Sequence, residues 1–255
     1  MADPQSAGAE VVRAEARGRV YAALSRAFLY PDPPLYEALV SGEFLTVLEE
    51  ALAEVPEARG LWGAAAGAAL RDALGRSLER LPTRAEWEGR YLRLLGQPAA
   101  PLCPPFETEY TASHLYMQTQ AMADIAGFYR AFGVGLPEGG GRPDHIATEL
   151  EFLYFLSVKE ALALDDGHGE RLAVCREAHS RFLEDHLGRW TGVLHALLRR
   201  HDEGGFYAAL AGLTDAWVSL QCERAGALPR KVTRLTPLSR DGLDAGVAGA
   251  GRKGE

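Results

Sequence analysis

Cysteine is scarce in this sequence, and none of it is clustered. Cys103, Cys175 and Cys222 lie far apart in a chain of 255 residues, and no CxxC motif occurs. A disulfide framework needs an even set of cysteines, and a structural zinc site needs closely spaced pairs of ligands. The three thiols are therefore expected to be reduced, as is typical of a cytoplasmic protein.

Long apolar segments are missing as well. No apolar run approaches the roughly 20 residues that a membrane-spanning helix requires. The N-terminal stretch MADPQSAGAEVVRAEARG has no basic region followed by an apolar one, so no signal peptide is expected. The sequence therefore predicts a soluble protein that stays in the cytoplasm.

Positive charge is in deficit: 27 Lys and Arg face 35 Asp and Glu, for a net charge of −8. A general nucleic-acid-binding protein needs a basic face that contacts phosphates, so the composition argues against that class. An acidic chain suits a cationic partner, although the same balance is common in soluble proteins with no such partner.

Alternating β-branched stretches, which are typical of strands, do not stand out, and helical periodicity dominates. Val20, Leu24, Ala27 and Phe28, for example, lie on one face of a helix that the prolines after Tyr30 end. Proline and glycine mark the boundaries of the later segments. Thr83 and Glu86 have the spacing of a capping box, and Gly133 is expected to end a helix. Further helices are predicted at about 35–40, 43–52, 58–80, 83–96, 114–133, 144–164, 170–187, 189–201 and 205–225.

The predicted fold is all-α, a single globular bundle of about ten helices. It would occupy residues 10–236, after a flexible N-terminus (1–9) and before a disordered tail (237–255) rich in Gly, Ala and charge. The four prolines in QPAAPLCPPFETEY (97–110) predict an extended connector. This connector and the glycine-rich loop before residue 142 either divide the bundle into two lobes or are long loops within one domain.

The segment GGGRPDHIATELEFL (139–153) poses the main chemical question. Asp144 is expected to be the N-cap of the helix, and His145 to lie at an exposed loop mouth, where it can contact a ligand or titrate near neutral pH. The helix is apolar almost all round and is therefore expected to be buried. Its Glu149 and Glu151 then need partners, either Arg or Tyr from neighbouring helices or a bound cationic ligand.

Established catalytic and metal-binding motifs do not occur. The glycine run is not followed by GK[ST], so it gives only a weak indication of phosphate binding. There is no HExxH, no Glu-x-x-His and no GxSxG. We therefore predict no catalytic residues and no metal ligands.

The stretch PDHIATELEFL (143–153) resembles the signature of the TorD/DmsD/NarJ family of molybdoenzyme maturation chaperones. YLRLLG with CPPFETEY, GFYRAFGV and FLEDHLGRW are similar to further family stretches and occur in the same order. The resemblance covers roughly residues 20–225. Small departures are Leu95 where Phe is common, and Phe106 and Thr108 where Tyr and Ser are common.

The resemblance implies a TorD-like helical chaperone and not an enzyme. Such proteins bind the twin-arginine leader or N-terminal region of the apo catalytic subunit of a DMSO-reductase-family molybdopterin oxidoreductase. They assist cofactor insertion before export or assembly. No tightly bound cofactor is implied, and a transient contact with molybdopterin guanine dinucleotide or GTP stays open. The partner would be that subunit, without nucleic acid or membrane insertion, and the chaperone would be a monomer or homodimer.

The resemblance also implies a partner-binding site. Pro143, Asp144 and His145 belong to its motif, together with Glu149 and Glu151. A leader with paired arginines and an apolar segment needs carboxylates beside an apolar groove. We expect Asp144 and nearby acids to bind the arginines and His145 to lie at the rim.

The wall of this groove is expected to consist of Tyr91, Phe106 and Tyr110. Two other functions stay open: a metal- or nucleotide-dependent helical enzyme, and a structural accessory subunit of the oxidoreductase. Stoichiometric metal would favour the enzyme, and retention in the mature complex would favour the accessory subunit. The missing ligand motifs argue against the enzyme. Which oxidoreductase is served is not encoded in these motifs.

Overall fold

The computed structural model describes residues 4–62, 65–96, 101–113, 115–135 and 141–233. Within these ranges every regular element is a helix, and the one β-type pairing is an isolated bridge between Phe106 and His145. This confirms the predicted all-α class. The predicted tail, 237–255, lies outside the described residues.

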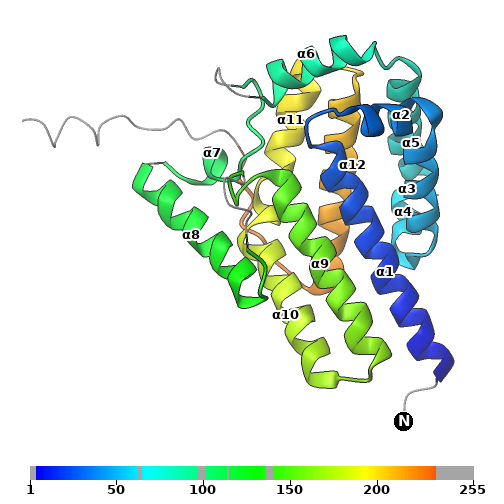
Figure 1. Cartoon of the computed structure of the whole chain (residues 1–255), viewed down its shortest axis with the longest axis vertical. Coiled ribbons are helices and arrows are strands. Elements are labelled where there is room, and N and C mark those ends of the chain that lie inside the picture. The colour runs from blue at the N-terminus through cyan, green and yellow to red at the C-terminus, as the bar shows by residue number, and fades with distance from the viewer. Residues whose placement is uncertain (1–3, 63–64, 97–100, 114, 136–140, 234–255) are drawn as a thin grey trace, which may run out of the picture.

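The longer helices are α1 (Pro4–Ala27), α5 (Ala65–Glu79), α8 (Leu115–Ala131), α9 (Ile146–Asp165), α10 (Gly169–Asp185) and α12 (Phe206–Ala225). The shorter ones are α2 (Pro33–Ser41), α3 (Glu43–Ala53), α4 (Arg59–Trp62), α6 (Arg84–Leu94), α7 (Thr108–Thr111) and α11 (Thr191–His201), with 3-10 turns η1 (Pro56–Ala58) and η2 (Leu187–Arg189). In Figure 1, α1 and α9 run side by side through the middle, α2 to α5 lie on one side, and α8 lies at the opposite edge.

Helix α1 begins earlier than the sequence predicts. The flexible N-terminus was expected to reach residue 9, but the helix starts at Pro4. Proline is tolerated in a first turn because the first N–H groups have no intrahelical acceptor. The ion pair between Arg176 Nη2 and Glu10 Oε2, 3.0 Å long, also ties this end of α1 to α10. Residues 4–9 therefore form the first turns of α1.

The centre of the fold is the packing of α1 against α9. A Cβ atom added at Gly18 would lie 3.3 Å from Tyr154 Cδ2 and 3.4 Å from Ser157 Cβ. Glycine at this position therefore lets the two backbones approach closely. Ser25 of α1 also donates to the Ala147 carbonyl, 2.8 Å away, near the start of α9. These contacts fix the position of the helix that carries the motif.

The buried apolar side chains form one continuous cluster that reaches from Ala16 to Ala227. Trp87 of α6 packs on Phe206 and Tyr207 of α12, so the segment before the proline-rich connector shares this core with the last helix. The described residues on both sides of the connector and of the glycine-rich loop thus share one core. The predicted capping box of Thr83 and Glu86 is present.

Candidate partner-binding site

The proline-rich connector lies directly beside the Pro-Asp-His motif. The Glu107 N–H donates to the Asp144 carbonyl at 2.8 Å, and the Ile146 N–H donates to the Pro105 carbonyl at 2.9 Å. These two bonds flank the Phe106–His145 bridge. Through this pairing, two segments about 40 residues apart in the sequence form one small structural unit at the start of α9.

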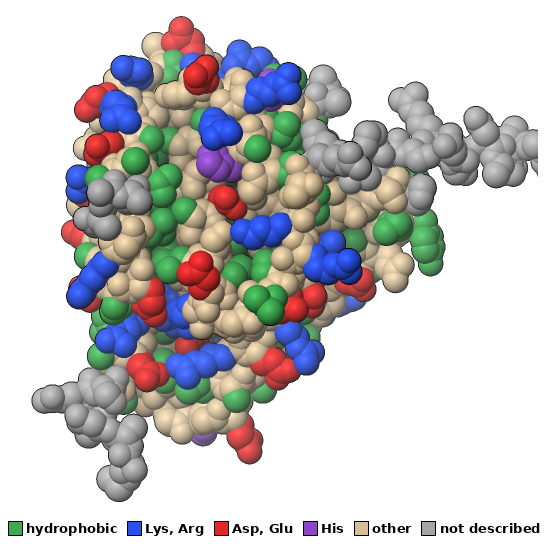
Figure 2. Space-filling model, turned by 180° about the vertical axis from the view of Figure 1, so that it is seen from behind, with side chains coloured by type: hydrophobic (Ala, Val, Ile, Leu, Met, Phe, Trp, Pro, Cys, Tyr) green, Lys and Arg blue, Asp and Glu red, His purple; other side chains and the backbone are tan. Residues whose placement is uncertain are grey.

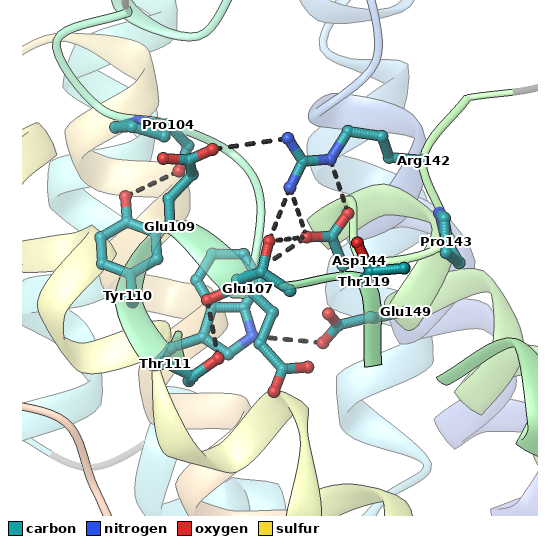
Figure 3. Close-up of polar contacts among 12 residues, drawn as sticks. Pro104, Glu107, Glu109, Tyr110, Thr111, Thr119, Arg142, Pro143, Asp144 and Glu149 are labelled. Carbon is teal, nitrogen blue, oxygen red and sulfur yellow. Dashed lines mark hydrogen bonds and ion pairs between the residues drawn. The ribbon is translucent and has the colours of Figure 1, made fainter. Parts of the chain in front are cut away.

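Asp144 is fully buried, and four donors surround its carboxylate (Figure 3). Its Oδ2 accepts from the Thr108 N–H (3.2 Å), the Thr108 hydroxyl (2.7 Å) and Arg142 Nη2 (2.7 Å), and its Oδ1 accepts from Arg142 Nε (2.9 Å). The predicted N-cap role in α9 is therefore wrong: the carboxylate binds the first N–H of the short helix α7. Arg142 occupies the place that we expected a partner arginine to take.

His145 is the N-cap of α9. Its Nδ1 accepts from the Ala147 N–H at 3.1 Å, and its ring packs edge-on against Phe106 with centroids 5.3 Å apart. Burial lowers the pKa of His145 to about 4, an effect that outweighs the opposing charge of Asp144. The imidazole is therefore neutral at pH 7. This corrects the expectation of an exposed histidine that titrates near neutral pH.

Arg142 links the two segments through its charge and its flat face. Its Nη1 lies 3.4 Å from Glu109 Oε1, and its guanidinium lies 4.2 Å from the centroid of the Phe106 ring. Figure 3 shows the guanidinium between Glu109 and Asp144. The bidentate pair with Asp144 and the contact with an aromatic face are both favourable for arginine and poorly reproduced by lysine.

Glu149 is fully buried one turn further along α9. Its Oε2 accepts from Trp190 Nε1 at 3.2 Å, while its Oε1 receives no N–H donor, and the Glu107 carboxyl lies nearby. Burial raises the pKa of Glu149, and the nearby Glu107 carboxylate raises it further. Glu149 thus favours its neutral, protonated form, without the Arg or Tyr partner that the sequence suggested. Trp190 in turn stacks on Tyr110, with centroids 5.3 Å apart.

Glu107 connects this cluster to the surface. Its side chain is buried, with Oε2 3.1 Å from His186 Nδ1 and Oε1 3.8 Å from Arg189 Nη1. It forms part of an open groove of about 820 Å³ between α8, the end of α10 and η2. Other lining residues are Asp124, Phe128, Arg130, Asp185, His186 and Arg189. Glu107 is therefore a buried acid that borders solvent-accessible space.

Glu151 does not belong to the buried cluster. It is exposed, which corrects the expectation that it needs a buried partner. The apolar pattern predicts a helix covered on every side, but one side of α9 is open to solvent. Glu151 borders a smaller hollow of about 290 Å³ with Tyr129, Phe152 and Phe155. It lies beside the cluster on the same helix.

Of the remaining predicted residues, some lie at the buried cluster and one lies away from it. Pro143 is partly exposed, and its carbonyl accepts from the Tyr129 hydroxyl at 2.8 Å. Tyr110 lies in the cluster and donates from its hydroxyl to the Pro104 carbonyl at 2.6 Å. Tyr91 packs instead against Tyr30 and Tyr207, and its place in a common wall with Phe106 and Tyr110 has no support from these contacts.

Several residues of the cluster have no role in the site predicted from the sequence: Glu107, Thr108, Arg142, His186 and Trp190. A signal was present, because all except Arg142 lie in stretches similar to the family pattern, and Arg142 directly precedes the motif. Phe128, from another such stretch, packs edge-on against His186 at 5.3 Å. Four stretches that are similar to the family therefore meet at one place in the fold: CPPFETEY, GFYRAFGV, PDHIATELEFL and FLEDHLGRW.

Other site types find little support in the described part of the chain. No group of three or more His, Cys, Asp or Glu there is arranged to hold a metal ion. No helix among the described residues combines the length and apolar character of a membrane span. On the face shown in Figure 2, acidic and basic side chains are interspersed and do not form a single charged patch.

The fold and cluster define a helical protein whose family-like stretches converge on buried acids beside an open groove. Residues 61–196, slightly more than half of the chain, match the family described as "Nitrate reductase delta subunit". The chain belongs to this TorD/NarJ family.

Three curated relatives carry chaperone names. A chaperone protein TorD from Shewanella loihica is 36% identical over 84 residues, 33% of each chain. A perchlorate reductase assembly chaperone protein from Dechloromonas aromatica is 31% identical over 105 residues, 39% of this chain and 44% of that protein. A selenate reductase assembly chaperone protein from Thauera selenatis is 33% identical over 110 residues, 42% of this chain and 56% of that protein. The matches thus span a third to just over half of these relatives.

Proposed function

We propose that this protein is an assembly chaperone, not an enzyme, for the apo catalytic subunit of a DMSO-reductase-family molybdopterin oxidoreductase. It would bind the subunit's twin-arginine leader or N-terminal region in the cytoplasm and assist cofactor insertion before export or assembly. The observation that carries this proposal is the open groove with buried Glu107 at its edge, built from the stretches that match the family.

The charges of the groove indicate which acids would receive a partner's arginine. Asp144 is fully buried and already holds Arg142 through two nitrogens. Asp124 and Asp185 are exposed and line the groove with Glu107. Asp124 and Asp185 are the better candidates for a first contact, because a guanidinium binds accessible carboxylates without breaking an existing pair. Glu107 is buried and borders the groove beside them. The motif residues then act by holding the connector that carries Glu107.

The contact between Glu107 and Arg189 is loose enough to be exchanged. Their nearest atoms are 3.8 Å apart, longer than a hydrogen bond, and Arg189 is partly exposed. An incoming guanidinium can therefore approach Glu107 while Arg189 moves into solvent. Phe128 provides an apolar surface beside this position for the segment that follows the arginines. Any contact with molybdopterin guanine dinucleotide or GTP would be transient in this proposal.

The test is a calorimetric titration in which leader peptides from molybdoenzyme subunits encoded in the same genome are added to the protein. We expect the double variant Asp124→Asn/Asp185→Asn to bind about two- to thirty-fold more weakly, because it loses two exposed charge pairs of about 0.2–1 kcal/mol each. Asp165→Asn, an exposed acid at the far end of α9, is the matched control. Equal peptide affinity of the wild type, the double variant and the control would show that these two acids of the groove do not bind the leader.

Purification of the tagged protein from its source cells tests the function itself. Recovery of an unprocessed, cofactor-free catalytic subunit supports a chaperone. Recovery of only the mature, cofactor-loaded enzyme would indicate an accessory subunit instead. Stoichiometric metal on the isolated protein, without any client, would indicate an enzyme.

A further inference from the structure

A second cluster of charged residues lies at the other end of α9. It borders a small pocket of about 160 Å³ formed by α1, η1, α9, α10 and α12. Glu160 belongs to it and lies three turns beyond Glu149, roughly 16 Å along the helix at 1.5 Å per residue. The pocket is lined by Glu10, Arg13, Arg17, Glu57, Glu160, Arg176 and Arg224. We refer to it as the arginine pocket.

The one buried carboxylate of the arginine pocket is fully used by two arginines. Glu160 is 2% exposed; its Oε2 accepts from Arg17 Nη2 at 2.8 Å, and its Oε1 accepts from Arg176 Nε at 2.8 Å. Arg176 also reaches Glu10, which is exposed. Glu57 is exposed as well. Water and salt screen these two outer carboxylates, so they offset little of the positive charge inside.

Two arginines of the pocket lack a carboxylate partner. Among the described residues, no acidic oxygen lies within 4.0 Å of Arg13 or Arg224, and the Nε of Arg224 donates to Gln221 Oε1 at 2.9 Å. Arg17 is 5% exposed, and its buried Nε has no acceptor. Burial lowers the pKa of Arg224, and the positive charge of Arg17 lowers it further. Positive charge is therefore in excess at this place.

We propose that the arginine pocket binds a tetrahedral oxyanion, either free phosphate or the phosphoryl group of a small ligand, between Arg13, Arg17 and Arg224. Guanidinium groups bind such oxyanions through paired N–H donors, and the buried Arg17 Nε is a donor that lacks an acceptor. A pocket of 160 Å³ accommodates one phosphoryl group, while a larger ligand would extend from it into solvent. This site is separate from the groove of the proposed function.

The experiment measures thermal stability and calorimetric binding of the full-length protein with sodium phosphate, against sodium chloride at equal ionic strength. We expect phosphate alone to raise Tm, because a ligand that binds only the folded state stabilises it. Arg224→Gln should bind phosphate at least ten-fold more weakly. Arg224 is partly exposed and has no ion pair to lose, so this variant is expected to fold. Arg181→Gln, an exposed arginine on α10, is the control and should match the wild type.

Further ligands identify the source of the oxyanion. A pyrophosphate or GTP response stronger than that of phosphate assigns the pocket to a phosphorylated ligand, and an equal response assigns it to free phosphate. The same Tm in phosphate and chloride, or unchanged phosphate binding by Arg224→Gln, would overturn the proposal. Leader-peptide binding by Arg224→Gln is measured in parallel, because it should be normal and a failure of the proposed function would be seen separately.

Discussion

Helix α9 carries two buried glutamates whose surroundings are opposite. Glu149, near its N-terminal end, contacts the Trp190 indole, lies close to another acid and has a raised pKa. For Glu160, near the C-terminal end, burial alone would raise the pKa, but Arg17 and Arg176 lower it overall. The same side chain on one helix is thus driven toward a neutral form at one end and an ionised form at the other. The partners from other helices decide the charge.

The largest effect on stability is expected from replacing Glu160, the ionised glutamate of the two. Glu160→Gln leaves the buried Arg17 guanidinium without its carboxylate, which should cost about 3–5 kcal/mol in the free energy of unfolding. Urea denaturation measures this loss. Glu177→Gln, which breaks an exposed pair with Arg181, should cost at most about 0.5 kcal/mol. Similar losses in the two variants would contradict the argument from burial.

The next largest effect is expected where a buried acid holds the motif. Asp144→Asn removes the charge that Arg142 binds and should destabilise the protein by about 1.5–3 kcal/mol. Glu109→Gln disturbs only the 3.4 Å contact with the same arginine and should change stability by about 0.5 kcal/mol or less. Chemical denaturation of both variants compares the two acids. Equal stability of the two would show that Asp144 does not anchor Arg142.

The raised pKa of Glu149 should make the stability of the protein depend on pH. Because its folded-state pKa is raised, Glu149 contributes stability that is present below its unfolded pKa of about 4.3 and is lost as pH rises through the folded value. Glu149→Gln lacks this loss. The variant should therefore gain on the wild type by up to about 1.4 kcal/mol per pH unit as pH increases above that point. Stability curves that stay parallel between pH 5 and 8 would contradict a raised pKa.

The smallest effect is expected from replacing His145, the N-cap of α9. His145→Ala should cost about 1 kcal/mol, while His145→Asn should cost less, because asparagine is also a good N-cap. Because burial lowers the pKa of His145 to about 4, its contribution is present above the unfolded value of about 6.5 and is lost as pH falls toward 4. Both variants should lose less stability over that acidic range. Thermal denaturation at pH 7 and pH 5 measures both effects.

The local patterns predicted the helices well because their signals are short-range. Thr83 with Glu86 predicted a capping box, and Gly133 predicted a helix end; it has φ +72° just after α8. The placement of Asp144 failed for the opposite reason. An acid before a helix is usually its cap, but this carboxylate binds Arg142, two residues away, and Thr108, 36 residues away in the sequence. The approach of Thr108 depends on the tertiary fold.

The grouping of residues at the start of α9 was predicted in part, while their role in binding a partner stays a prediction. Phe106, Asp144, His145 and Glu149 lie close together, as the similarity of their two stretches to one family suggested. Tyr91 and Glu151 do not join them. Helical periodicity gives the faces of a helix but not which face a neighbour covers, so the open side of α9 could not be assigned from its apolar residues alone.

The sequence by itself determined the all-helical class, most helix boundaries and the family, because propensity, caps and ordered motifs are local properties of the chain. Tertiary structure alone decided which carboxylates are charged, which are already paired and where excess positive charge remains. These depend on burial and on distances of a few ångströms between groups from different helices. Glu149 and Glu160 are both glutamates in the sequence, and only the folded protein raises the pKa of one and lowers that of the other.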